Sequence, residues 1–258
     1  MIDLIKAEKE FKEYTSHFKV ADQKVNVKVK HTYGVVRAAE YIAKGLNLSD
    51  EDVELAKLIG LLHDIGRFEQ AVRYDNYSDY DTMDHADFGV KLLFEDNLIR
   101  EFIDDNQYDE IIKKAVANHN KFEIEKGLND RELLHAKIIR DADKTDNFVI
   151  KQYQDFYSLF RATEEEVGKE KITDLVWQEF LSGKTIVTHH RKNNIDAWVS
   201  YLAWVYDYNF VPGLKYLKEN DCIDKVIDRL QYQNEDTKEK MEYVRKVTKE
   251  YIEKRINE

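Results

Sequence analysis

The sequence predicts an all-α protein, and three observations support this prediction. The chain of 258 residues contains a single proline, Pro212, and only nine glycines, so few residues interrupt a helix. Apolar residues recur at the spacing of one helix face along most of the chain. Hydrophobic residues make up 43% of the chain, which is enough for a packed core. The length fits one large domain, or a core domain with a helical extension.

The first core helices follow from apolar stripes. A stripe that begins at Val35 predicts a helix that ends before Asn47. Ser49, followed three residues later by Asp52, is typical of a helix start and caps a second helix. This second helix is apolar on nearly all sides toward its end, so we expect it to be the central buried helix, terminated at Gly66.

The rest of the chain alternates between one long polar segment and further helices. Residues 67–84 are polar, aromatic and aperiodic, which predicts a functional or mobile loop. We predict helices at residues 84–96, 98–106, 108–118, 130–160, 173–182, 194–220 (interrupted at Pro212) and 236–257. We assign residues 20–160 to a helical core and residues 161–258 to a C-terminal helical extension that packs on this core.

Charge and cysteine content exclude several classes of function. The formal net charge is −11, and an acidic chain repels the phosphate backbone, so we expect no nucleic-acid polymer as partner. A small phosphorylated substrate remains compatible with this acidic chain, because a bound metal reverses the local electric field. The single cysteine, Cys222, can form neither an intramolecular disulfide nor a thiolate metal site by itself. Residues 1–12 predict an amphipathic helix rather than a signal peptide, and no run approaches a membrane span, so we expect a cytoplasmic protein.

Several histidines and aspartates continue the apolar helix faces. His63 and Asp64 stand together at the end of the most buried helix, where an unpaired imidazole or carboxylate is costly. His119 and Asp143 each end another apolar stripe, and His31 begins the first core helix. One such residue would be a satisfied core group, but several of these types predict a shared hydrophilic centre inside a helix bundle.

The order of these residues resembles the HD superfamily of metal-dependent phosphohydrolases. The resemblance rests on His31, then LLHDIG (residues 61–66), then RDADKTDNF (residues 140–148). HADFG (residues 85–89) and ANHN (residues 117–120) lie where six-ligand branches of the superfamily carry two further histidines. The resemblance implies an all-α HD-domain bundle with a dinuclear metal site, in which Asp64 bridges two ions; a single ion is the alternative. The implied ligands are His31, His63, Asp64, His85, His119 and Asp143.

The implied chemistry is phosphoryl hydrolysis. Nitrogen and oxygen ligands without thiolates suit divalent iron, manganese, magnesium, cobalt or nickel. Such ions activate water and neutralise phosphoryl oxygens, so the resemblance implies hydrolysis of a small nucleotide or other phosphoester, with Asp64 at its centre. Lys144 is expected to bind phosphate or protonate the leaving group, and solvation is its alternative. Arg67 is expected to clamp phosphate, or else to pair with Glu69 or a loop aspartate.

The sequence leaves open the roles of several other residues and the class of function. Asp146 and Asn147 fit partners that orient ligand histidines, or solvated helix residues. His135 fits a core or supporting role, and we expect no metal role for His189 and His190. No GYP signature follows the histidines, which disfavours the cyclic-dinucleotide branch. The alternatives to a hydrolase are a non-catalytic nucleotide or metal sensor and a diiron oxygenase, and the C-terminal helices either wall the cavity or form a homodimer.

Overall fold

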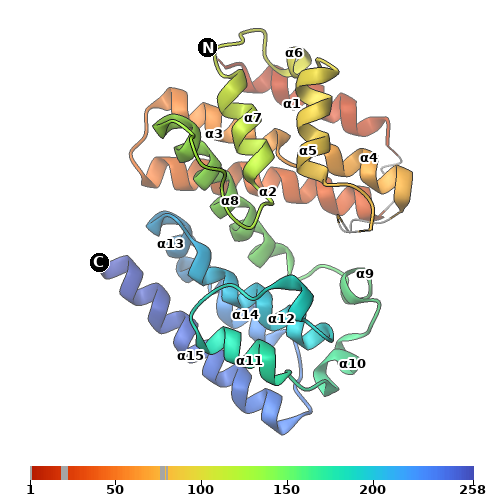
Figure 1. The fold of residues 1–258 in the computed structure, drawn as a ribbon, viewed down its shortest axis with the longest axis vertical. Helices are drawn as coiled ribbons and strands as arrows, with labels where there is room; N and C mark the ends of the chain where they lie inside the picture. The colour runs from red at the N-terminus through yellow and green to blue at the C-terminus, as the bar shows by residue number, and fades with distance from the viewer. Residues whose placement is uncertain (1, 19–22, 76–78, 80) are drawn as a thin grey trace. The chain divides into compact units, whose positions relative to one another are not determined.

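The computed structural model describes residues 2–18, 23–75, 79 and 81–258, and the regular elements in this part of the chain are helices, as the sequence predicts (Figure 1). The chain divides into two compact units, Met1–Asp146 and Asn147–Glu258. The boundary falls inside helix α8 (Asp130–Ile150).

The first unit begins with three helices, α1 (Leu4–Ser16), α2 (Gln23–Gly45) and α3 (Asp50–Leu62). The predicted cap is confirmed, because the Ser49 side chain accepts a hydrogen bond from the backbone N–H of Asp52 at 3.2 Å. Helices α2 and α3 pack closely where Gly60 meets Val36; a Cβ atom at Gly60 would lie 3.2 Å from the Val36 Cα. Helix α3 is buried along most of its length, as expected for a central helix.

Gly66 does not end the central helix, so that prediction was wrong. Helix α3 ends at Leu62, and helix α4 (Ile65–Tyr74) begins where the sequence suggested a loop. Gly66 lies in the first turn of α4, where a Cβ atom would overlap the carbonyl oxygen of His85 and lie 2.9 Å from the Gly89 nitrogen. The glycine is therefore needed for the close approach of α4 to α5 (His85–Val90).

The expected loop over residues 67–84 is correct only after Tyr74. Helix α4 buries Phe68, Gln70 and Ala71 but exposes Val72 and Tyr74, so polar and aromatic residues on its outer side concealed the helical period. Residues 75, 79 and 81–84 have no helical structure, whereas residues 76–78 and 80 of the expected loop lie outside the described residues.

The remaining helices of the first unit follow the prediction with shorter bounds. Helix α5 continues into a π-helical turn (Lys91–Glu95), followed by α6 (Ile99–Phe102) and α7 (Asp109–Asn118). The helix expected over residues 130–160 is interrupted, because α8 ends at Ile150 and α9 (Phe156–Phe160) starts separately. Asp155 caps α9 by accepting a hydrogen bond from the backbone N–H of Ser158 at 2.7 Å.

The second unit contains α10 (Glu164–Lys169), α11 (Asp174–Leu181), α12 (Asn194–Leu202), α13 (Val211–Glu219), α14 (Cys222–Asp228) and α15 (Glu235–Asn257). Pro212 lies in the first turn of α13 and so starts that helix; the interruption itself is the 3-10 turn Ala203–Asp207. The short helices α10 and α14 escaped the sequence pattern. Helix α15 buries Met241, Val244 and Ile252 in the core of this unit, so its apolar face packs against other helices of the unit.

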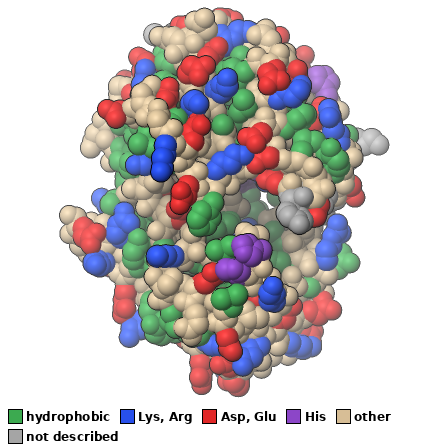
Figure 2. All heavy atoms as spheres, viewed as in Figure 1, with side chains coloured by type: hydrophobic (Ala, Val, Ile, Leu, Met, Phe, Trp, Pro, Cys, Tyr) green, Lys and Arg blue, Asp and Glu red, His purple; other side chains and the backbone are tan. Residues whose placement is uncertain are grey.

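None of the helices in the described part is both long and apolar enough to cross a membrane. Figure 2 shows acidic and basic side chains intermixed over the visible face.

Candidate metal centre

Four imidazoles and two carboxylates meet in the interior of the first unit. His31 comes from α2, and Asp143 comes from α8. His63 is the C-cap of α3, and Asp64 follows it at the N-cap of α4, where its side chain makes no capping hydrogen bond and is free to face the centre. The two remaining histidines are His85, the first residue of α5, and His119, the C-cap of α7.

Asp64 lies in the middle of this cluster. Its Oδ1 atom is 3.2 Å from His85 Nε2 and 3.6 Å from His119 Nε2. Its Oδ2 atom is 3.5 Å from His63 Nε2 and 3.8 Å from His31 Nε2. Each carboxylate oxygen therefore faces its own pair of imidazoles, and the structure contains two groups of three possible ligands that share Asp64.

Asp143 adds a fourth possible ligand to the first group, and in the second group the two imidazoles lie against each other. The Asp143 Oδ1 atom is 2.9 Å from His31 Nε2 and 4.0 Å from His63 Nε2. In the second group, the Nε2 atoms of His85 and His119 are 2.9 Å apart. The structure thus brings together all six residues that the sequence suggested as ligands.

The cluster fits a divalent metal. Ligand atoms that lie about 2.0–2.2 Å from a common ion are about 3 to 3.5 Å from one another, which is the spacing of most of these nitrogen and oxygen atoms. The Nε2 atom of His63 is buried and has no hydrogen-bond partner. Because buried polar atoms are normally satisfied, a lone pair in this position suits coordination of a metal ion.

Hydrogen bonds to backbone carbonyls fix the orientation of two of the four imidazole rings. His63 Nδ1 donates to the Gly60 oxygen at 2.8 Å, and His119 Nδ1 donates to the Val116 oxygen at 2.8 Å. A carbonyl oxygen can only accept, so the proton of each neutral ring lies on Nδ1. The Nε2 lone pairs are then directed at the centre, as metal ligation requires.

Hydrogen bonds to carboxylates fix the orientation of the other two imidazole rings. His85 Nδ1 is 2.7 Å from Asp79 Oδ2, and His31 Nδ1 is 2.8 Å from Asp146 Oδ2. Gly34 makes room for Asp146, because a Cβ atom at that position would overlap the Asp146 carboxylate. Such outer carboxylates orient a metal-binding imidazole and make it a stronger base.

The electrostatics of the cluster favour ionised carboxylates. Burial raises the pKa of Asp64, but Lys28 and the neighbouring imidazoles outweigh it and hold that pKa well below its usual range. The Lys28 Nζ atom lies 2.8 Å from Asp64 Oδ2. Burial lowers the pKa of His31, yet hydrogen bonds to Asp143 and Asp146 raise it to about 9. A cation that binds here would compete with the Lys28 ammonium for Asp64 Oδ2.

The residues that the sequence suggested for phosphate binding lie at or near the cluster. Arg67 Nε is 3.7 Å from Asp64 Oδ1, and its Nη1 atom donates to Asp79 Oδ1 at 2.6 Å, so its partner is a loop aspartate. Glu69 pairs with Arg73 instead, at 3.1 Å. Lys144 follows Asp143 in α8 and is half-buried.

The remaining histidines lie outside the cluster. His135 is fully buried in α8, and its Nε2 atom is 3.0 Å from Asp52 Oδ1, which is a supporting contact within the first unit. His190 belongs to the second unit and pairs with Glu179 at 2.6 Å. Sequence reasoning overlooked Lys28 and Asp79. The only signal for Lys28 was its place one helical turn before His31.

Comparison with known families agrees with this geometry. Residues 29–147 match the family model of the HD domain. The chain carries an HD domain. The matched segment contains all six residues of the metal centre, and HD domains bind divalent metals through such histidines and aspartates. Comparison of the chain with curated proteins and with solved structures gave no match.

Proposed function

We propose that this HD-domain protein is a metal-dependent phosphohydrolase that acts on a small nucleotide or another small phosphoester or phosphoanhydride. The observation that carries the proposal is the position of Asp64, whose two oxygens each face a separate pair of imidazoles. This arrangement supports two divalent ions with Asp64 between them. The proposed ligands are His31, His63, Asp64, His85, His119 and Asp143.

Divalent ions held by this centre would supply an activated water and would neutralise phosphoryl oxygens. The chain itself supplies two cations at the same place. The Lys28 ammonium contacts Asp64, with 21% of its side chain exposed, and the Arg67 guanidinium lies beside the same carboxylate, with 14% exposed. These partly exposed cations can bind phosphoryl oxygens, and Lys144 extends the positive charge along α8.

The donor set also narrows the choice of metal. Four imidazole nitrogens and two carboxylates make a centre richer in nitrogen than magnesium usually takes. Imidazole ligands suit iron and nickel, whereas magnesium and manganese favour oxygen ligands. We therefore place iron and nickel ahead of magnesium in the proposed function, with manganese and cobalt as the other candidates.

The experiment combines elemental analysis with turnover. The purified full chain is loaded with each candidate metal and assayed on a panel of nucleotides and simple phosphoesters, with and without a chelator. We expect metal-dependent release of phosphate or nucleoside that falls to background in Asp64→Asn and Asp64→Ala. The matched control is Asp104→Ala in the same unit, because that carboxylate is 88% exposed and forms only a surface ion pair with Lys6.

The outcomes separate the proposed function from its rivals. Metal-replete protein that is inert across the whole panel contradicts the hydrolase. Stabilisation by a nucleotide without any turnover would instead identify a sensor. Bound iron together with oxygen consumption would identify an oxygenase.

A further inference from the structure

Gln70, on the inner side of α4, is a polar side chain that is fully buried. Its amide nitrogen lies 3.0 Å from Asp79 Oδ1, 2.8 Å from the Thr82 hydroxyl and 2.9 Å from the Met83 carbonyl oxygen. Its amide oxygen accepts a hydrogen bond from Arg67 Nη1 at 2.7 Å. A neutral side chain thus connects helix α4 with the segment that precedes α5.

The partners of Gln70 fix the orientation of its amide. An arginine side chain can only donate hydrogen bonds, and a backbone carbonyl can only accept them. The amide oxygen must therefore face Arg67, and the amide nitrogen must face the Met83 carbonyl. Both hydrogen bonds would be lost if the amide were turned over. A buried amide with fixed partners holds the segment around Met83 in one place.

The Asp79 carboxylate connects Gln70 with the metal centre. Its Oδ1 atom accepts hydrogen bonds from Gln70 Nε2 at 3.0 Å and from Arg67 Nη1 at 2.6 Å. Its Oδ2 atom lies 2.7 Å from His85 Nδ1 and 3.3 Å from Asn120 Nδ2. One oxygen of Asp79 therefore orients the imidazole of a candidate metal ligand, while Gln70 and Arg67 hold the other oxygen.

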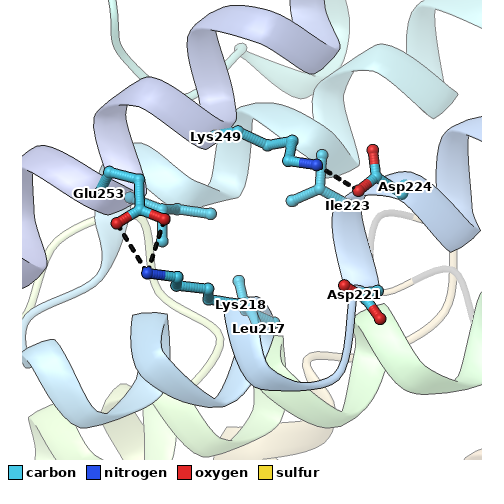
Figure 3. A pocket seen from close by; sticks show the side chains of 8 residues that line it. Leu217, Lys218, Asp221, Ile223, Asp224, Lys249 and Glu253 are labelled. Carbon is cyan, nitrogen blue, oxygen red and sulfur yellow. Dashed lines mark hydrogen bonds and ion pairs between the residues drawn. The ribbon is translucent and has the colours of Figure 1, made fainter.

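The ion pairs of a pocket in the second unit provide a contrast. The pocket has a volume of about 260 Å³ and lies between α13, α14 and α15 (Figure 3). Lys218 pairs there with Glu253. Lys249 pairs with Asp224. Both lysine side chains are exposed, so water can replace either carboxylate and such pairs contribute little. Gln70 is fully buried, so water cannot take over its hydrogen bonds.

We propose that Gln70 is a positioning residue of the metal centre, which acts through Asp79 to hold the His85 imidazole toward the ion. The inference rests on the proposed function, because it takes His85 as a metal ligand. A buried amide is costly unless its hydrogen bonds are made, and an apolar side chain of the same length would fill the position without them. The amide of Gln70 is therefore needed for its hydrogen bonds rather than for its volume.

The test measures how tightly the full chain binds Co²⁺, a candidate metal whose visible absorption reports its coordination, in a competition titration against a chelator. Gln70→Met keeps the length of the side chain and removes the amide. We expect it to weaken the binding of one ion about 10-fold, because Asp79 no longer holds His85 in a single orientation. The ion on the other side of Asp64, away from His85, should bind as it does in the unchanged chain.

A double-mutant cycle separates positioning from a general loss of stability. Asp79→Ala should weaken the binding of the same ion about 10- to 100-fold. In the Asp79→Ala background, Gln70→Met should cause no further loss of metal affinity, because Gln70 acts through Asp79. His135→Gln is the matched control, since His135 is an equally buried polar residue of the first unit whose partner, Asp52, lies outside the metal cluster. This control should bind Co²⁺ as the unchanged chain does.

Gln70→Glu takes the place of Gln70→Met if the latter does not fold. The glutamate has the same size and still accepts from Arg67, but it has no N–H group for Asp79 or Met83, so it should lose at least as much metal affinity. Equal Co²⁺ affinity in the unchanged chain and in the Gln70 variants overturns the inference, as do equal losses from Gln70→Met in both backgrounds of the cycle.

The titration also distinguishes this inference from the proposed function. Metal affinity is measured without a substrate, so a selective loss in Gln70→Met supports the positioning role even if the chain hydrolyses no phosphoester. Unchanged Co²⁺ affinity in Gln70→Met, together with metal-dependent hydrolysis, overturns the positioning role and leaves the hydrolase. An unchanged chain that binds no Co²⁺ overturns both proposals.

Discussion

Replacing Gly66 by alanine tests the packing that brings α5 to the metal centre. The new Cβ atom would overlap the carbonyl oxygen of His85 and lie 2.9 Å from the Gly89 nitrogen, so backbone must move. Gly89 stands opposite and supplies a matched control. A Cβ atom there has its nearest neighbour, the Ile65 side chain, at 3.4 Å, which is an ordinary contact.

Gly66→Ala is expected to destabilise the protein, whereas Gly89→Ala is expected to leave its stability unchanged or to raise it. Overpacking costs about 1–3 kcal/mol and occasionally more, while the better helix propensity of alanine offsets at most about 1 kcal/mol. Gly66→Ala should therefore lower the free energy of unfolding by about 1–2 kcal/mol or more. Gly89→Ala has no overlap to relieve, so it should be neutral or stabilise by up to about 1 kcal/mol.

Thermal unfolding of the two single variants measures this difference. At roughly 2–4 °C per kcal/mol for a chain of this size, the midpoint of Gly66→Ala should lie about 2–12 °C below that of Gly89→Ala. Gly66→Ala should also bind less metal, since displacement of the His85 backbone draws its imidazole away from Asp64. Equal midpoints for the two variants would refute the argument that Gly66 is required for the close approach of α4 and α5.

Three further predictions follow from single contacts. Asp146→Ala should weaken metal binding about 10- to 100-fold in a competition titration, because His31 loses the carboxylate that orients it. Lys28→Gln should tighten metal binding, since the ammonium no longer competes for Asp64, yet lower kcat/KM for phosphoesters. Burial holds the pKa of His135 below the value of about 6.5 in the unfolded chain. The folded state thus binds fewer protons, so urea unfolding should show stability falling as the pH drops below about 6.5, and His135→Gln should show less of this loss.

The metal centre could be predicted from sequence because its ligands obey the helical period. His119 and Asp143 end apolar stripes, so a straight extrapolation of each helix face directs them inward. His63 and Asp64 stand at the end of a helix that is buried on nearly all sides. Whether a polar residue continues an apolar helix face can be determined from the neighbouring sequence. The structure shows that the polar residues identified in this way form one cluster.

The outer partners of the centre could not be predicted in this way. Asp79 reaches His85 from a segment without helical period, so no spacing rule connects the two residues. Gly66 resembled a helix terminator, because its role depends on the backbone of α5, which is distant in sequence from the end of α3. Close approaches between separate helices are properties of tertiary packing, and a single sequence contains no direct record of them.

The metal centre is recognised by a physical criterion that the sequence alone cannot supply. His63 Nε2 is a buried atom without a hydrogen-bond partner, and carboxylates and imidazoles surround it, so its lone pair is suited to a cation. The sequence places His63 at the end of a buried helix, but it does not show which groups face the imidazole ring. That arrangement exists only in three dimensions.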